Sequence, residues 1–93
     1  MGAKVKNLAT AGERSATGMN DTIGVLVVEV SPGSGAAKFF QANDVILLFN
    51  NKKVNKLRDL FEARISVIGS NTEALIFRNQ KEIKIRVELN GEK

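Results

Sequence analysis

The stretch from Gly24 to Asn50 limits what this chain can fold into more than any other part of it. It contains two apolar runs of strand length, Gly24–Val30 and Val45–Phe49, and the first is rich in β-branched residues. Pro32 and the glycines beside it end the first run, because proline donates no backbone hydrogen bond and glycine adopts angles closed to other residues. Both runs are continuous rather than alternating, so we expect each strand to be covered on both faces.

The connection between these runs and the turn after them carry signals of their own. Ser34 can cap a short helix over Ala36–Phe39. Asn43 precedes the second run, and Asn50 and Asn51 follow it. Asparagine is the best non-glycine occupant of the left-handed region, so we expect a positive φ at these turn positions.

The rest of the chain predicts four further strands. Residues 82–89 alternate between apolar and charged side chains, which is typical of a strand with one buried face. A hairpin turn at Arg78–Lys81 joins this strand to the one before it. The four strands are expected over Ala3–Lys6, Lys52–Val54, Thr72–Phe77 and Glu82–Leu89.

One longer helix is expected among these strands. Apolar residues recur at spacings of three and four from Leu57, which predicts an amphipathic helix from Leu57 to about Val67, with Asn55 as its N-cap. In contrast, Ala9–Asp21 is small and polar, and is predicted to be a loop with at most one helical turn around Glu13–Ala16.

These elements predict an α+β fold that is mainly β. We expect a partly open antiparallel β-barrel of five to six strands capped by two helices. The chain has 93 residues, enough for one hydrophobic core, and its 43% hydrophobic residues are typical of a folded protein. We therefore expect a single domain over residues 1–93.

The composition excludes several kinds of chemistry. The chain has no histidine and no cysteine, so it cannot build a Ser-His-Asp triad, a Cys-His pair or an ordinary zinc site. We expect no catalytic residues, no metal and no cofactor in this chain. The net charge of +4 comes from scattered basic residues, so nucleic acid is not an expected partner. No apolar run has the length of a membrane span.

The central stretch resembles the signature of a PDZ domain of the type found in HtrA/Deg-like bacterial serine proteases. The matching residues are Gly24–Val28, Val30, Pro32–Ser34, Ala36–Ala37, Asp44–Leu47 and Asn50. The resemblance implies a PDZ fold that binds C-terminal or extended hydrophobic peptides by β-strand addition. It also implies a substrate-recognition or regulatory domain of a serine endopeptidase in the periplasm or cell envelope. The chain would then be an N-terminally clipped fragment, and other domains or subunits of the parent protease would be further partners.

The resemblance also suggests where a peptide would bind. In such domains, backbone N–H groups of a loop hold the ligand carboxylate, because successive N–H dipoles form an anion-binding concavity. The loop and the strand that pairs with the peptide correspond to Gly2, Ala3, Lys4 and Val5, and the groove side of the helix corresponds to Leu57, Phe61 and Arg64. The central stretch itself is expected to supply core and turns rather than ligand contacts.

Simpler interpretations of these residues stay open at this point. Met1 and Gly2 can be an initiator methionine and a cloning remnant. Phe61 is expected to make the pocket for the last ligand side chain shallow, and Arg64 to favour an acidic ligand residue. Alternatively, Leu57 and Phe61 are ordinary core residues and Arg64 is a solvated charge. Phe39 and Phe40 are expected to be core residues.

Two alternatives to the functional prediction remain. The chain can be a structural or assembly PDZ domain with a non-functional groove, or the PDZ domain of another exported or membrane protease.

Overall fold

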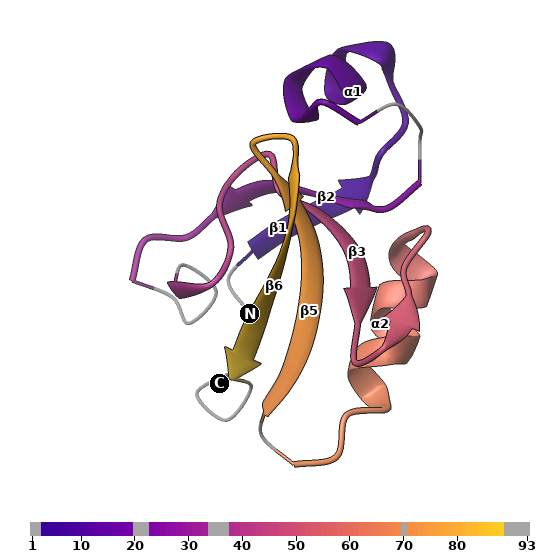
Figure 1. Ribbon diagram of the computed structural model, residues 1–93, viewed down its shortest axis with the longest axis vertical. Coiled ribbons are helices and arrows are strands. Elements are labelled where there is room, and N and C mark those ends of the chain that lie inside the picture. The colour runs from indigo at the N-terminus through magenta and orange to yellow at the C-terminus, as the bar shows by residue number, and fades with distance from the viewer. Residues whose placement is uncertain (1–2, 20–22, 34–37, 70, 89–93) are drawn as a thin grey trace.

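The computed structural model describes residues 3–19, 23–33, 38–69 and 71–88. Its elements follow one another as β1 (Ala3–Asn7), α1 (Ala11–Thr17), β2 (Val25–Val30), β3 (Val45–Phe49), β4 (Lys52–Lys53), α2 (Leu57–Ile65), β5 (Asn71–Arg78) and β6 (Lys81–Glu88) (Figure 1). The predicted fold class is confirmed: the described residues form a mainly β structure with one six-stranded sheet and two helices.

Every strand pairs with its neighbour in the antiparallel sense, in the order β1-β2-β3-β5-β6, with β4 paired to β3 beside this path. The sheet is open, and β1 lies at one edge of it. α2 lies alongside β3 and β4, whereas α1 stands at one end of the molecule, away from most of the sheet (Figure 1). This arrangement leaves the edge strand β1 as a neighbour of α2.

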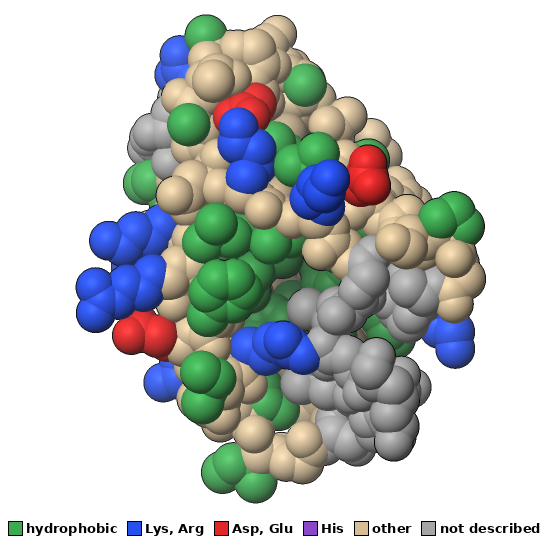
Figure 2. Space-filling model, turned by 180° about the vertical axis from the view of Figure 1, so that it is seen from behind, with side chains coloured by type: hydrophobic (Ala, Val, Ile, Leu, Met, Phe, Trp, Pro, Cys, Tyr) green, Lys and Arg blue, Asp and Glu red, His purple; other side chains and the backbone are tan. Residues whose placement is uncertain are grey.

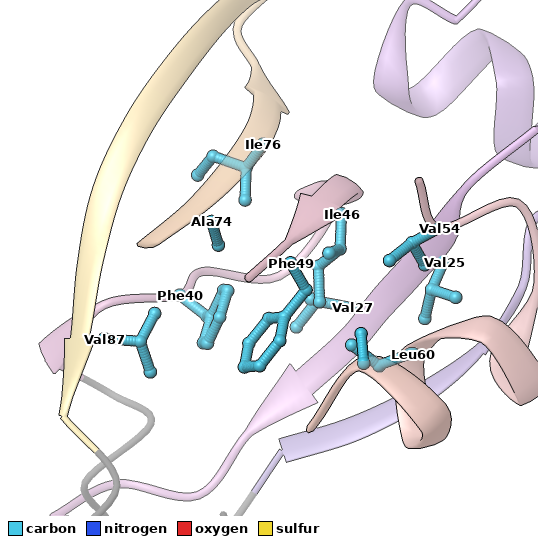
Figure 3. Packing of buried hydrophobic residues seen from close by; sticks show 11 residues of the cluster. Val25, Val27, Phe40, Ile46, Phe49, Val54, Leu60, Ala74, Ile76 and Val87 are labelled. Carbon is cyan, nitrogen blue, oxygen red and sulfur yellow. The ribbon is translucent and has the colours of Figure 1, made fainter. Parts of the chain in front are cut away.

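The main core lies where the sheet curves around α2. In Figure 3 the rings of Phe40 and Phe49 point into a common interior, with Val27 and Leu60 beside them. The cluster consists of Val25, Val27, Phe40, Ile46, Phe49, Val54, Leu60, Ala63, Ala74, Ile76 and Val87. Alternate side chains of a strand point to opposite faces, and so β2 and β3 also contribute to a smaller second cluster, which is formed by Leu8, Leu26 and Val45.

The expectation that β2 and β3 are covered on both faces holds only in part. Val25, Leu26 and Val27 are buried, whereas Val28 is 38% exposed and Glu29 is also exposed. The register between β1 and β2 shifts beside this point, since Lys4 pairs with Glu29 but Val5 pairs with Val27. Val28 and Glu29 therefore lie outside the two clusters, while Val30 packs against the main one, and the prediction is wrong for Val28 and Glu29.

The turns confirm the predicted role of asparagine. Asn43, Asn50 and Asn51 have φ values of 73°, 54° and 63°. Asn79 and Gln80, at the tip of the β5–β6 hairpin, have φ values of 52° and 62°. Two consecutive left-handed residues are what a two-residue hairpin turn with the twist of the strands requires.

α1 corrects the prediction of a loop over residues 9–21. The Thr10 hydroxyl accepts a hydrogen bond from the Glu13 N–H at 3.1 Å, and the Glu13 carboxylate accepts one from the Thr10 N–H at 3.1 Å. This is a capping box, which stabilises a first helical turn, and the helix ends at Gly18 with a φ of 81°. The Thr-x-x-Glu spacing was the signal that could have predicted it.

The other two helix predictions had different outcomes. The short helix expected over Ala36–Phe39, with its cap at Ser34, lies largely outside the described residues. α2 is confirmed, but it ends at Ile65 rather than near Val67. Its N-cap is Lys56 rather than Asn55, and the Lys56 side chain makes no capping hydrogen bond.

Candidate functional site

A pocket of about 100 Å³ lies between β1 and α2. Ala3 and Val5 of β1 form one side of it, and Phe61 and Arg64 of α2 form the other. Buried apolar residues make the floor, namely Val27, Phe40, Ile46 and Leu60. Figure 2 shows apolar side chains gathered around a hollow on this face, with a basic side chain beside it.

β1 brings backbone groups to this pocket as well as side chains. Its inner edge pairs with β2, and among the strands of the described residues none pairs with its outer edge. The outer edge of an edge strand offers a row of N–H and C=O groups to any further strand. The pocket therefore lies beside a backbone edge to which an extended segment can bind.

α2 presents apolar surface both inside and outside the pocket. Leu60 and Ala63 are buried in the core, whereas Phe61 is 53% exposed although it lines the pocket. Phe61 and Arg64 also line a shallower hollow of about 430 Å³, together with Ile65, which is 83% exposed. Phe61 is thus a half-exposed residue that lines the pocket, rather than an ordinary core residue.

A buried ion pair holds the segment that contributes Phe40 to the pocket floor. The Asp44 carboxylate is 1% exposed and accepts two hydrogen bonds from Arg78, at 2.9 and 2.7 Å. It also accepts one from the Gln41 N–H, and Arg78 donates another to the Phe39 carbonyl. These four bonds anchor the chain on both sides of Phe40, whose ring is 2% exposed. The hydrogen bond to Asp44 is the main cause that raises the pKa of Arg78.

The profile of the PDZ domain family matches residues 1–89. This chain belongs to the PDZ domain family. No curated protein matches it significantly in sequence.

Solved structures with a similar fold include PDZ domains of HtrA-type proteins. The HtrA3 PDZ domain bound to a phage-derived ligand (FGRWV) is 18% identical, with a TM-score of 0.74 over 95% of this chain and 81% of that one. The HtrA-type protease AlgW with a decapeptide is 22% identical, with a TM-score of 0.75 over 94% of this chain. This PDZ domain corresponds to 27% of the AlgW chain. At these identities the likeness shows the fold.

The structure of this PDZ domain brings four of the seven predicted site residues together: Ala3, Val5, Phe61 and Arg64 all line the pocket. Lys4 is exposed and does not line it, and Leu57 is half-buried and packs against the main core. Gly2 lies outside the described residues. A peptide-binding role for these residues stays a prediction.

Sequence reasoning missed the floor of the pocket. Val27, Phe40 and Ile46 come from the central stretch, which was expected to supply only core and turns. Each of them is a buried core residue that also faces the space between the edge strand and α2. The missing information was tertiary, because a core residue becomes a pocket residue only where the two walls leave space above it.

Within the described ranges, no group of three or more His, Cys, Asp or Glu residues is arranged to hold a metal ion. No helix there is long and apolar enough to cross a membrane.

Proposed function

We propose that this PDZ domain binds the C-terminal or extended hydrophobic segments of other proteins by β-strand addition. The observation that carries the proposal is the position of the pocket between the exposed face of α2 and the outer edge of β1, with which none of the described strands pairs. Hydrogen bonds to the β1 backbone would supply affinity, and the pocket would select one ligand side chain. The HtrA3 structure supports it, since that PDZ domain is bound to a phage-derived ligand, and the HtrA-type protease AlgW also has a structure with a decapeptide.

The size and lining of the pocket support a class of ligand. Its volume of about 100 Å³ is smaller than the ~150 Å³ cavity that accommodates benzene, so an aliphatic side chain fits it better than an aromatic ring. Arg64 contributes a positive charge at the side of an otherwise apolar pocket. It would favour a ligand with an acidic group near that side chain, through charge complementarity.

The fold likeness to HtrA-type proteins supports a parent protein of that kind. In this proposal the domain recognises or regulates substrates for an HtrA/Deg-like serine endopeptidase, in the periplasm or cell envelope. The chemistry of peptide cleavage would belong to another domain of the parent.

A calorimetric titration tests the peptide-binding proposal. A peptide that ends in an aliphatic residue with a free carboxylate should bind, and its amidated twin should bind about tenfold more weakly or worse, because charge-assisted hydrogen bonds are lost. Phe61→Ala should weaken binding, whereas Ile68→Ala, which alters an apolar residue that is 95% exposed and does not line the pocket, should not. Equal binding of both peptides to the wild-type domain and both variants would contradict the proposal.

The apolar surface beyond the pocket favours a second candidate function. Phe61 and Ile65 line one shallow hollow and are 53% and 83% exposed, and exposed apolar patches are typical of protein contacts. In this alternative the domain is an assembly element that contacts another domain or subunit of its parent. It predicts that peptides produce no binding heat at all.

A further inference from the structure

The residues of the pocket floor are held in two different ways. Three of them belong to regular elements: Val27 lies in β2, Ile46 in β3 and Leu60 in α2. Phe40 belongs to none, because it lies in the connection between β2 and β3. Neither the ladder of a strand nor the hydrogen bonds of a helix therefore fix the position of this ring.

Hydrogen bonds from Arg78 hold this connection in place. In the described part of the chain, the bond from Arg78 Nη2 to the Phe39 carbonyl, at 3.0 Å, is the only one that joins residues 38–42 to another element. The same guanidinium donates twice to Asp44, whose carboxylate accepts a hydrogen bond from the Gln41 N–H at 2.8 Å. One side chain of β5 thus fixes the backbone on both sides of the aromatic floor residue.

A polar hollow of about 280 Å³ lies on the outer side of this connection. It is lined by residues 15–18 at the end of α1, by residues 41–44 of the connection and by residues 78–80 of the β5–β6 hairpin. The connection therefore borders a space into which it can shift. The bonds from Arg78 oppose such a shift, which would carry Phe40 away from the floor.

Arg78 itself lies outside the groove between β1 and α2. It is the last residue of β5, and it does not line the pocket. Any influence of this side chain on a ligand in the pocket must therefore pass through the connection that it holds.

We propose that Arg78 determines which ligand side chain the pocket accepts, because it holds Phe40 in the floor. This inference rests on the proposed peptide-binding function. With the ring in place, the pocket of about 100 Å³ favours an aliphatic side chain. When the ring shifts, the floor deepens and an aromatic side chain gains access. Arg78 is a positioning residue, and Phe40 is the residue through which it acts.

Two peptides that differ only in their last residue, valine or phenylalanine, test this inference by calorimetry. The wild-type domain should bind the valine peptide about tenfold more tightly, since an apolar pocket distinguishes side chains by size. Phe40→Leu shortens the floor side chain and should reduce this ratio to about twofold. Arg78→Lys keeps a positive charge beside Asp44 but loses the planar fork, and should reduce the ratio to about threefold.

Three further variants separate positioning from general stability. Phe49→Leu shortens another buried ring of the main core, which does not line the pocket, and should leave the ratio unchanged. Adding Arg78→Lys to Phe40→Leu should change the ratio little further, because the effects of residues that act through one another are not additive. Asp44→Asn breaks the ion pair from its other side and should reduce the ratio as well, so it provides the same test if Arg78→Lys does not fold.

The outcomes are distinct. If the wild-type domain binds neither peptide, the proposed function fails. If peptides bind but Arg78→Lys weakens both equally, Arg78 has only a structural role, so the inference is overturned and the proposed function stands. A change of the ratio in Phe49→Leu as large as that in Arg78→Lys would overturn the inference in the same way.

Discussion

The two helices of this domain differ in what determines them. α1 has a capping box formed by its own residues Thr10 and Glu13, and Thr17 is its one buried residue. In α2 the N-cap residue Lys56 makes no side-chain capping bond, and the N–H of Leu57 donates to Asn7 of the distant strand β1. α2 also buries Leu60 and Ala63. Local signals therefore define α1, which stands apart from the pocket, while tertiary contacts define α2, which forms one wall of it. The difference predicts that changes in α1, which meets β1 through the Lys6–Glu13 ion pair, affect the groove less than changes in α2 do.

The largest expected effect is a loss of stability and peptide affinity when a buried residue of α2, rather than of α1, is replaced. Leu60 is 3% exposed and lines the pocket, so Leu60→Ala should lower the free energy of unfolding by about 3 kcal/mol and weaken peptide binding. Thr17→Ala removes a hydroxyl that donates to the Glu13 carbonyl at 2.9 Å, and should cost about 1 kcal/mol without changing peptide affinity. Urea unfolding and calorimetry measure both quantities. Similar losses of stability and affinity in the two variants would remove the distinction between the helices.

A smaller effect is expected from the cap of α1. Thr10→Ala leaves the Glu13 N–H without its acceptor, and should lower the free energy of unfolding by about 1 kcal/mol. Hydrogen exchange should accelerate in α1 and stay unchanged in α2, because no capping bond of α2 involves Thr10. Thr10→Ser retains the acceptor and serves as the matched control. Faster exchange in both helices would show that α1 supports the groove after all.

The smallest expected effect is a pH dependence of the stability, which arises from Glu13 of α1. The hydrogen-bonded ion pair with Lys6, and then the N–H groups of Ala9 and Thr10, lower the pKa of Glu13 from 4.5 to about 2. Because the folded pKa lies below the ordinary value, ionised Glu13 stabilises the fold above pH 4.5, and this contribution is lost as the pH falls from 4.5 through 2. Glu13→Gln should therefore unfold at a lower temperature than the wild type at pH 7.

The two thermal midpoints should converge between pH 4.5 and 2. Lys6→Gln removes the largest cause of the low Glu13 pKa and should show the same convergence. Differences that stay constant over this pH range would contradict the role assigned to the Lys6–Glu13 pair.

Most of the fold could be predicted because its signals are local. The apolar runs of β2 and β3, the alternation in β6 and the left-handed asparagines are each encoded within a few residues. The sequence analysis did not predict α1, because a short polar segment gives no apolar periodicity. The signal for this helix is nevertheless local, since Thr10 and Glu13 have the spacing of a capping box. The N-cap of α2 could not be found in the same way, because its acceptor, Asn7, lies 50 residues away in sequence.

The sequence predicts residues in the two walls of the pocket, but not those of its floor. β1 and α2 carry recognisable patterns, and four of their predicted residues line one pocket. The floor depends on Phe40, which is placed by the ion pair between Asp44 and Arg78, 34 positions apart. Such a contact leaves no periodic trace in the sequence, so the depth of the pocket became visible only in the folded chain.

The most direct test of peptide binding between β1 and α2 follows the backbone amides during a titration with a peptide that ends in an aliphatic residue and a free carboxylate. Chemical shifts should change in Ala3–Val5 and in Phe61–Arg64, and stay constant in α1, while the amidated twin should leave both walls nearly unchanged. Shifts that are centred on α1, or a spectrum that does not respond to either peptide, would contradict the account.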